Sequence, residues 1–302
     1  MQISDETRTI LLCCTHLGMK VREKPFALRE WESIVWKLEQ NGMAYGMLPL
    51  FDEADMKRAG LSKQESKRIF RLLKNRDLDG CLREYKQRMN MHIIGQGDRH
   101  YPTALHRKRE LNAPPLFYAV GNLDLLTAYD ERIAIVGKRD CHVDAESICA
   151  HLVRRFASPT TCFVSGGARG IDRLAQHAVS RMEGNMMIIV PYGLNEKTIA
   201  DLSADQNGNY LLLSAEEPRA VFQKHAALQR NAWIYALSNR AFIVESASGS
   251  GGTWHGAKQA IQNHWTDVWV WNEPTFEGNQ RLLRMGAEPI DYQNGQFAAE
   301  EK

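Results

Sequence analysis

From about residue 91 onward, short apolar runs alternate with amphipathic stretches, and this alternation constrains the fold of the 302-residue chain more than any other feature. The runs are MHIIG, RIAIVG, TCFVSGG, MMIIVPYG, YLLLSAE, RAFIVES and DVWVWNEP; the stretches include DAESICAHLVRRFA, IDRLAQHAVSRM and WHGAKQAIQNHW. Such alternation predicts parallel strands joined by helical crossovers. Runs that are apolar throughout predict a sheet covered on both faces. We therefore expect a doubly wound, mainly parallel α/β domain over residues 89–302.

Residues 1–88 predict a separate, small helical domain. In FALREWESIVWKLEQNGM, Trp31, Ile34, Val35 and Leu38 follow the spacing of one helix face. LSKQESKRIFRLLK repeats the pattern, with Ser62 as the expected N-cap. These helices also carry basic residues that form either a solvated face or a nucleic-acid patch: Lys57, Lys63, Lys67, Arg68, Arg71 and Lys74.

The composition does not identify a ligand, but it indicates where in the cell the protein is located. The 38 basic and 36 acidic residues give a net charge of +2, so any binding of nucleic acid would need a local basic cleft. No run approaches the roughly 18 apolar residues of a membrane-spanning helix, and the start of the chain does not resemble a secretory signal. The six cysteines show neither CxxC pairs nor zinc spacing. We expect a cytoplasmic protein with no metal site and no membrane contact.

Three strand ends carry glycine-rich turns that could hold an anion. In an open parallel sheet, ligands bind beyond the carboxyl ends of the strands. Glycine lets backbone N–H groups approach a ligand, and a following helix N-terminus adds partial positive charge. One such turn is equally compatible with close strand–helix packing, but three in one sheet favour an anion site. The first turn contains Gly137, Lys138 and Arg139; the second contains Ser165, Gly166, Gly167, Arg169 and Gly170; the third spans residues 248–253.

The spacing of the glycines argues against two familiar classes of nucleotide-binding protein. Neither GxxxxGK[ST] nor a clean GxGxxG is present, which disfavours a mononucleotide kinase and an ordinary NAD enzyme. No cofactor is therefore expected.

A basic residue within an apolar helix face adds to this hypothesis. If QKHAALQRNAWIYALSNRAF is helical, Ala227, Arg230, Ile234 and Leu237 share one face. A charge removed from water needs a partner. Arg230 either forms an internal salt bridge, with Asp172 or Glu245, or projects into the cleft to bind phosphate through its planar guanidinium.

In this order the motifs resemble those of the DNA-processing protein A family (DprA, also called Smf). The resemblance covers about residues 91–291 and runs through AIVGKR, SGGARGID, MIIVPYGL, LLLSAEEP, QRNAWIYALS, VESASGSGGTWHGA and GNQRLLRMGAEPI, after the lead-in GDRHYPTALHRKRELNAPPLFYAVGN. It implies an extended Rossmann-like core, preceded by a helical domain of the SAM or helix-hairpin-helix kind. No C-terminal winged helix is expected.

The chain departs from the family pattern at several positions. Lys138 stands where the family usually has serine, Ala232 replaces the second arginine of its RNR motif, and Gln176 replaces a histidine. The family's YP after the third-strand glycine is missing, and Trp254 occupies the place of a small residue. These departures imply a basic pocket that is retained but rewired.

Members of the family bind single-stranded DNA in a basic pocket, usually as dimers, protect it and hand it to the RecA recombinase during transformation. The resemblance implies that role in DNA processing or recombination here, without enzymatic activity. Trp254 and His255 are candidate platforms for base stacking, although Trp254 also fits a packed core position. Carried over position by position, the phosphate-binding residues are Gly137, Lys138, Arg139, Ser165, Gly166, Arg169, Gly170, Arg230, Asn231, Ser248 and Gly249.

The alternative hypothesis is a nucleotide-binding sensor or a phosphoribohydrolase-like enzyme of the lysine-decarboxylase-like Rossmann group, in phage defence for example. That group carries a PGGxGTxxE loop, and SGSGGTWHGA has the GGT. The position of the loop's glutamate falls on Gly256, so the carboxylate needed for sugar cleavage is missing there. Glu245 or Asp172 would have to substitute for it.

Overall fold

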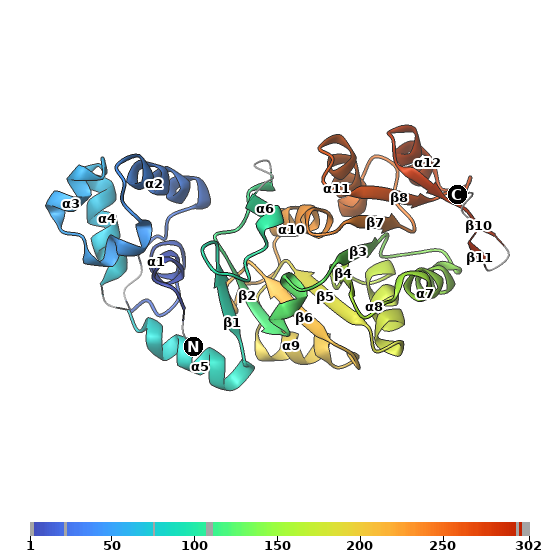
Figure 1. The fold of residues 1–302 in the computed structure, drawn as a ribbon, viewed down its shortest axis with the longest axis horizontal. Coiled ribbons are helices and arrows are strands. Elements are labelled where there is room, and N and C mark those ends of the chain that lie inside the picture. Colours follow the sequence, from blue (N-terminus) through green and yellow to red (C-terminus); the bar gives the residue numbers. More distant parts are fainter. Residues whose placement is uncertain (1–2, 21–22, 75, 107–110, 294–295, 298–302) are drawn as a thin grey trace. The chain divides into compact units, whose positions relative to one another are not determined.

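The computed structural model describes residues 3–20, 23–74, 76–106, 111–293 and 296–297, which form two compact units (Figure 1). The first unit comprises residues 1–101, 114–119 and 215–218, and the second comprises 102–113, 120–214 and 219–302. The domain boundary predicted between residues 88 and 89 stays a prediction. No helix within the described ranges is long and apolar enough to cross a membrane.

The first unit is helical, as predicted. Its elements are α1 (Asp5–Cys14), α2 (Leu28–Gln40), the 3-10 helix η1 (Tyr45–Leu50), α3 (Glu53–Arg58), α4 (Lys63–Leu73), α5 (Leu78–Met89) and the strand β1 (His92–Gly95). The apolar stripe of α2 is buried at Trp31, Ile34 and Leu38.

Reciprocal capping begins α4 where the sequence predicts it. The Ser62 hydroxyl accepts a hydrogen bond from the Glu65 N–H at 3.2 Å, and the Glu65 carboxylate accepts one from the Ser62 N–H at 2.7 Å. Part of the basic face is paired with acids: Arg68 lies 2.9 Å from Glu30.

The second unit contains seven parallel strands in the order β6-β5-β4-β3-β7-β8-β9. These strands are β3 (Glu131–Val136), β4 (Thr161–Ser165), β5 (Asn185–Val190), β6 (Tyr210–Ser214), β7 (Arg240–Ile243), β8 (Asp267–Trp271) and β9 (Glu288–Ile290). The predicted doubly wound, mainly parallel sheet is confirmed. The run MHIIG is an exception, because β1 pairs antiparallel with residues 116–119 of β2 (Leu116–Gly121).

Helices cover both faces of this sheet, which accounts for strands that are apolar throughout. Figure 1 shows α7, α8 and α9 on one side and α10, α11 and α12 on the other. Their bounds are α7 (Ala145–Phe156), α8 (Ile171–Arg181), α9 (Glu196–Ser203), α10 (Lys224–Ala236), α11 (Gly251–Gln262) and α12 (Glu277–Arg284). The smaller elements are α6 (Thr103–His106), η3 (Leu123–Leu126) and the pair β10 (Tyr292–Gln293) and β11 (Gln296–Phe297).

The strand order reverses at β3, and this reversal positions the site. The chain builds β4, β5 and β6 to one side of β3 and then returns to place β7, β8 and β9 on the other. As a result the carboxyl ends of β3 and β7 lie side by side, with Val136 opposite Ile243. Open α/β sheets bind ligands in the crevice outside such a switch point.

Candidate functional site

The first and third glycine-rich turns meet at this switch point. The Lys138 N–H donates to the Glu245 carbonyl oxygen at 2.9 Å, and the Thr253 hydroxyl donates to the Gly137 carbonyl oxygen at 2.9 Å. Each of the two segments thus donates one hydrogen bond to the other, and these bonds hold the turns together.

The second turn packs directly on the first. The Ile171 N–H donates to the Lys138 carbonyl oxygen at 3.2 Å. Gly170 has φ +78°, and a Cβ there would collide with the carbonyl oxygens of Lys138 and Arg139. A Cβ on Gly137 would likewise collide with the Ile171 side chain. These two glycines are required by the close approach of the turns, whatever ligand they serve.

A hollow of about 560 Å³ opens between the turns and α10. We call it the first hollow. The first turn contributes Gly137, Lys138 and Arg139 to it, and the third contributes residues 250–253. Its basic and amide side chains from α10 are Lys224, Arg230 and Asn231.

Arg230 is the most deeply buried cation of the first hollow, with 6% of its surface exposed. Ala227 and Ile234 line the hollow beside it, so the predicted helix face of α10 is confirmed for these residues, whereas Leu237 is the C-cap of the helix and does not line the hollow. Its Nε and Nη1 atoms have no hydrogen-bond partner among the described residues. A Cβ on Gly166 would collide with Nη1, so this glycine makes room for the guanidinium.

Asp172 is the electrostatic partner of Arg230. Burial raises the pKa of its carboxyl to about 6, while the charge of Arg230 and backbone N–H groups of Ala168 and Gly166 act in the opposite direction. The Ala168 N–H lies 3.4 Å from Asp172 Oδ2. For Arg230, burial lowers the pKa and the charge of Asp172 raises it. The two neighbouring charges therefore attract each other, yet Nε and Nη1 of Arg230 make no hydrogen bond to any described residue.

The sequence predicts that Lys138 is a cation available to phosphate, but its side chain is paired with a carboxylate. Its Nζ lies 2.7 Å from Glu245 Oε1, and Glu245 Oε2 accepts the His142 N–H at 2.9 Å. The Glu245 side chain is only 10% exposed. Lys138 is therefore largely neutralised where it lies, and Arg139 is the exposed cation of the first turn.

The N-terminus of α11 is directed at the first hollow. This helix begins at Gly251 after Ser250, whose side chain makes no capping hydrogen bond. Gly251, Gly252 and Thr253 line the hollow, so the free backbone N–H groups of the first helical turn are available there. The partial positive charge of the helix end adds to that of Arg230.

Six of the predicted residues lie outside the lining of the first hollow: Gly166 and Gly170, whose packing is described above, and Ser165, Arg169, Ser248 and Gly249. The Ser248 hydroxyl donates to Glu277 Oε1 at 3.0 Å and accepts from Arg281 Nη1 at 3.0 Å, and Gly249 adjoins it. Ser165 is fully buried, its hydroxyl 3.4 Å from the Asp172 carbonyl oxygen. Arg169 lines a neighbouring hollow instead.

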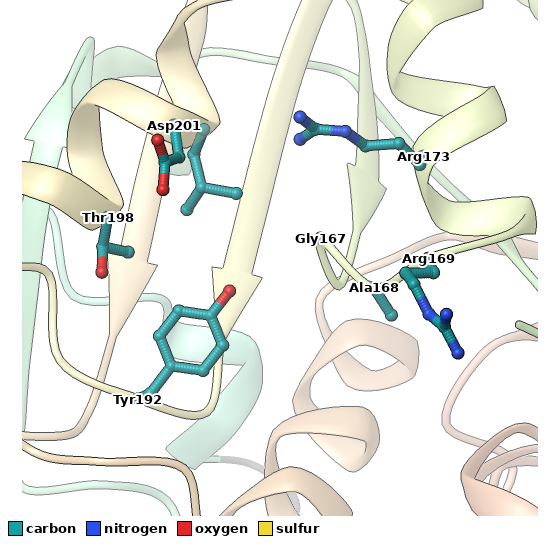
Figure 2. Close-up of a pocket in the computed structure, with 8 residues that line it drawn as sticks. Gly167, Ala168, Arg169, Arg173, Tyr192, Thr198 and Asp201 are labelled. Atoms are coloured by element: carbon teal, nitrogen blue, oxygen red, sulfur yellow. The ribbon is translucent and has the colours of Figure 1, made fainter.

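That neighbouring space, of about 450 Å³, is here called the second hollow (Figure 2). Ala168 lines both hollows, so the two are adjacent. The lining residues are Gly167, Ala168, Arg169, Arg173, Tyr192, Thr198, Asp201 and Leu202.

The exposure of each aromatic side chain shows which of them could stack on a base. Trp254 is 4% exposed and packs beneath Arg281, whose Cζ lies 4.9 Å from the ring centroid, so the core interpretation is confirmed. His255 is exposed but is not among the lining residues of the first hollow. Instead Phe222, with 54% of its surface exposed, lines that hollow. Nothing in the local sequence distinguishes Phe222 from a core phenylalanine.

Comparison with protein families gives one match over most of the chain. The model of the family described as DNA recombination-mediator protein A matches residues 92–300. Two curated proteins from Mycobacterium tuberculosis, from strains CDC 1551 / Oshkosh and ATCC 25618 / H37Rv, are named "Putative DNA processing protein DprA". Each is 29% identical to this chain over 143 residues, which are 46% of this chain and 37% of the relative. The match thus spans little more than a third of those relatives.

Two solved structures share the fold. DNA processing protein A from Streptococcus pneumoniae matches with a TM-score of 0.69 and 19% identity, over 99% of this chain and 100% of that one. DNA processing protein A from Helicobacter pylori, whose single-stranded DNA binding mode has been described, matches with a TM-score of 0.57 and 24% identity. That match covers 67% of this chain and 91% of the other.

Proposed function

Because the chain belongs to the DNA recombination-mediator protein A family, we propose that its second unit binds single-stranded DNA in the first hollow. The observation that carries this proposal is the buried guanidinium of Arg230, which lines an open hollow and whose Nε and Nη1 have no hydrogen-bond partner in the described part of the chain. An unpartnered buried donor is costly. Phosphate oxygens can accept hydrogen bonds from these nitrogens, because the planar guanidinium matches phosphate geometry.

A chain of phosphates suits the first hollow better than a single anion. Arg139 and Lys224 are exposed cations at its lining, and the N-terminus of α11 supplies backbone donors. These groups come from three separate segments, so consecutive phosphates can be held at once. Phe222 offers an exposed ring beside them, and unpaired bases stack on such rings whereas duplex bases cannot.

We propose that the protein does not catalyse a reaction on the strand or on free nucleotides. Glu245 is held by Lys138 and by the His142 N–H, so it is not poised to activate water. Asp172 lines the first hollow but interacts with Arg230 and the Ala168 N–H. Incubation with nucleoside monophosphates tests this point: release of free base would establish the phosphoribohydrolase alternative and contradict the proposal.

Family membership also supports the cellular part of the proposal. We expect a cytoplasmic homodimer that protects single strands and transfers them to a RecA-type recombinase during DNA processing. Light scattering of the purified chain checks the oligomeric state. A RecA-type strand-exchange assay, with and without the protein, checks the transfer, and an unchanged rate of exchange would contradict it.

The binding test compares three labelled ligands across a salt series by fluorescence anisotropy: a single strand, the matching duplex and a mononucleotide. We expect the single strand to bind tightest and its affinity to fall steeply with salt, because counterions are released from the phosphates. Arg139→Ala or Arg230→Ala should each weaken binding at least about tenfold, roughly 1.4 kcal/mol. Unchanged affinity in both folded variants would remove these residues from the site.

A further inference from the structure

The second hollow has walls of opposite chemical character. Figure 2 shows Thr198 and Asp201 projecting from α9 on one side, and residues 167–169 forming the other. Arg169 is exposed beside that second side, whereas Asp201 is an exposed carboxylate. A simple anion would be attracted by one wall and repelled by the other. A ligand with a negative group at one end and N–H donors at the other fits both.

Tyr192 provides a fixed aromatic surface between these walls. Its carbonyl oxygen accepts the Ser214 hydroxyl at 2.8 Å, and the next N–H, that of Gly193, donates to the Ala220 carbonyl oxygen at 2.9 Å. The turn after β5 is thus anchored on both sides. Burial raises the pKa of the Tyr192 phenol, so the ring remains neutral and can pack against an apolar or aromatic group.

Continuity with the first hollow identifies the ligand as part of the bound strand. Ala168 lines both hollows, and Arg169 follows it in the chain. A strand whose phosphates occupy the first hollow can therefore pass Ala168 with its next phosphate near Arg169. Its base then enters the second hollow beside Tyr192. A carboxylate accepts hydrogen bonds only, so Asp201 selects bases that present N–H groups.

We propose that the second hollow is a nucleobase subsite, in which Tyr192 contacts the base and Asp201 favours guanine. Guanine presents two adjacent donors, N1–H and N2–H, that match the two oxygens of a carboxylate. Thymine presents a single N–H between two carbonyl oxygens, which repel Asp201. This inference rests on the proposed function, and it adds a base preference that phosphate contacts alone do not provide.

The test uses the full chain and labelled oligothymidine strands of equal length, either unchanged or carrying one interior guanine. The guanine strand should bind about tenfold more tightly, in the range of one bidentate base contact. Asp201→Asn should abolish this difference, because an amide offers one acceptor and one donor. Glu196→Gln is the matched control: it removes a carboxylate from the same helix outside the hollow and should keep the preference. Tyr192→Ala should weaken binding of both strands.

The outcomes separate this inference from the proposed function. If unchanged oligothymidine binds tightly but guanine gives no gain, or if the gain survives Asp201→Asn, the subsite is refuted and the phosphate site stands. If the wild-type protein binds no single strand, the proposed function itself is refuted. Circular dichroism and thermal unfolding of each variant show whether a loss of binding comes from a loss of fold.

Discussion

Replacing Gly166 with alanine would displace the Arg230 guanidinium without deleting any charge. Gly166 does not have a left-handed φ, so alanine can adopt its backbone conformation. The added Cβ would lie far inside the normal contact distance of about 3.5 Å from Nη1. The guanidinium must therefore move by about 2 Å, which is enough to break a hydrogen bond to a phosphate.

The expected loss follows from the strength of that contact. A hydrogen bond involving a charged group contributes about 1.5–3 kcal/mol, so the single-strand affinity should fall roughly 10- to 150-fold. Overpacking should also lower stability by about 1–3 kcal/mol, which thermal unfolding will register. Fluorescence anisotropy at a fixed 0.15 M salt measures the affinity, because salt alone changes it strongly.

An alanine substitution at a second glycine serves as a control, because it separates the steric effect on Arg230 from the general effect of replacing a glycine. Gly97 lies in the first unit, and its nearest neighbour to an added Cβ is the Glu6 side chain at 3.6 Å, an ordinary contact. Gly97→Ala should leave the affinity unchanged. If Gly166→Ala remains folded and binds within about twofold of the wild type, Arg230 does not hold a phosphate and the reasoning fails.

Two further predictions concern the carboxylates of the site. The pKa of Asp172 is raised to about 6, so its charge is present above that pH and lost below it. As the pH falls from 7.5 to 5, Asp172 is protonated and Arg230 loses its charged internal partner, so single-strand affinity should rise. Asp172→Asn should reduce this pH dependence of the affinity. An equal pH response in the wild type and the variant would contradict the assignment of the effect to Asp172. Lys138→Ala should lower the thermal unfolding temperature, because it leaves the Glu245 carboxylate without its cation, while changing DNA affinity less than Arg139→Ala does. A larger loss of affinity for Lys138→Ala would show that Lys138 contacts the strand.

The sequence predicts the framework of the site because local patterns determine it. Apolar runs followed by glycine mark the ends of β3, β4 and β7, and parallel topology brings those ends to one edge. The 3.6-residue period likewise places Arg230 on the face of α10 that lines the first hollow. The strand β2 is missed, since its run follows Pro114 and Pro115 and pairs antiparallel.

Side-chain pairing lies beyond such patterns because it depends on residues far apart in the chain. Lys138 and Glu245 are separated by 107 positions and meet only after β3 and β7 are paired. Ser248 turns toward α12 to contact Glu277, although the preceding residue, Ala247, lines the first hollow. Tyr192 lies in MIIVPYGL, which marks the end of a strand, and Asp201 lies in no motif, so of the glycine-rich turns only the second points to this hollow.

The contrast between Lys138 and Arg230 shows which cation is prepared for a ligand. Lys138 has a carboxylate partner at 2.7 Å, and a phosphate would have to compete with it. Arg230 is more deeply buried, and its attraction to Asp172 is not completed by hydrogen bonds from Nε or Nη1. Burial without full pairing costs stability, and functional sites are where folded proteins tolerate such costs. Since Gly166 has no side chain to displace the guanidinium, the fold maintains this costly arrangement, and a phosphate would complete the hydrogen bonding that the protein leaves open.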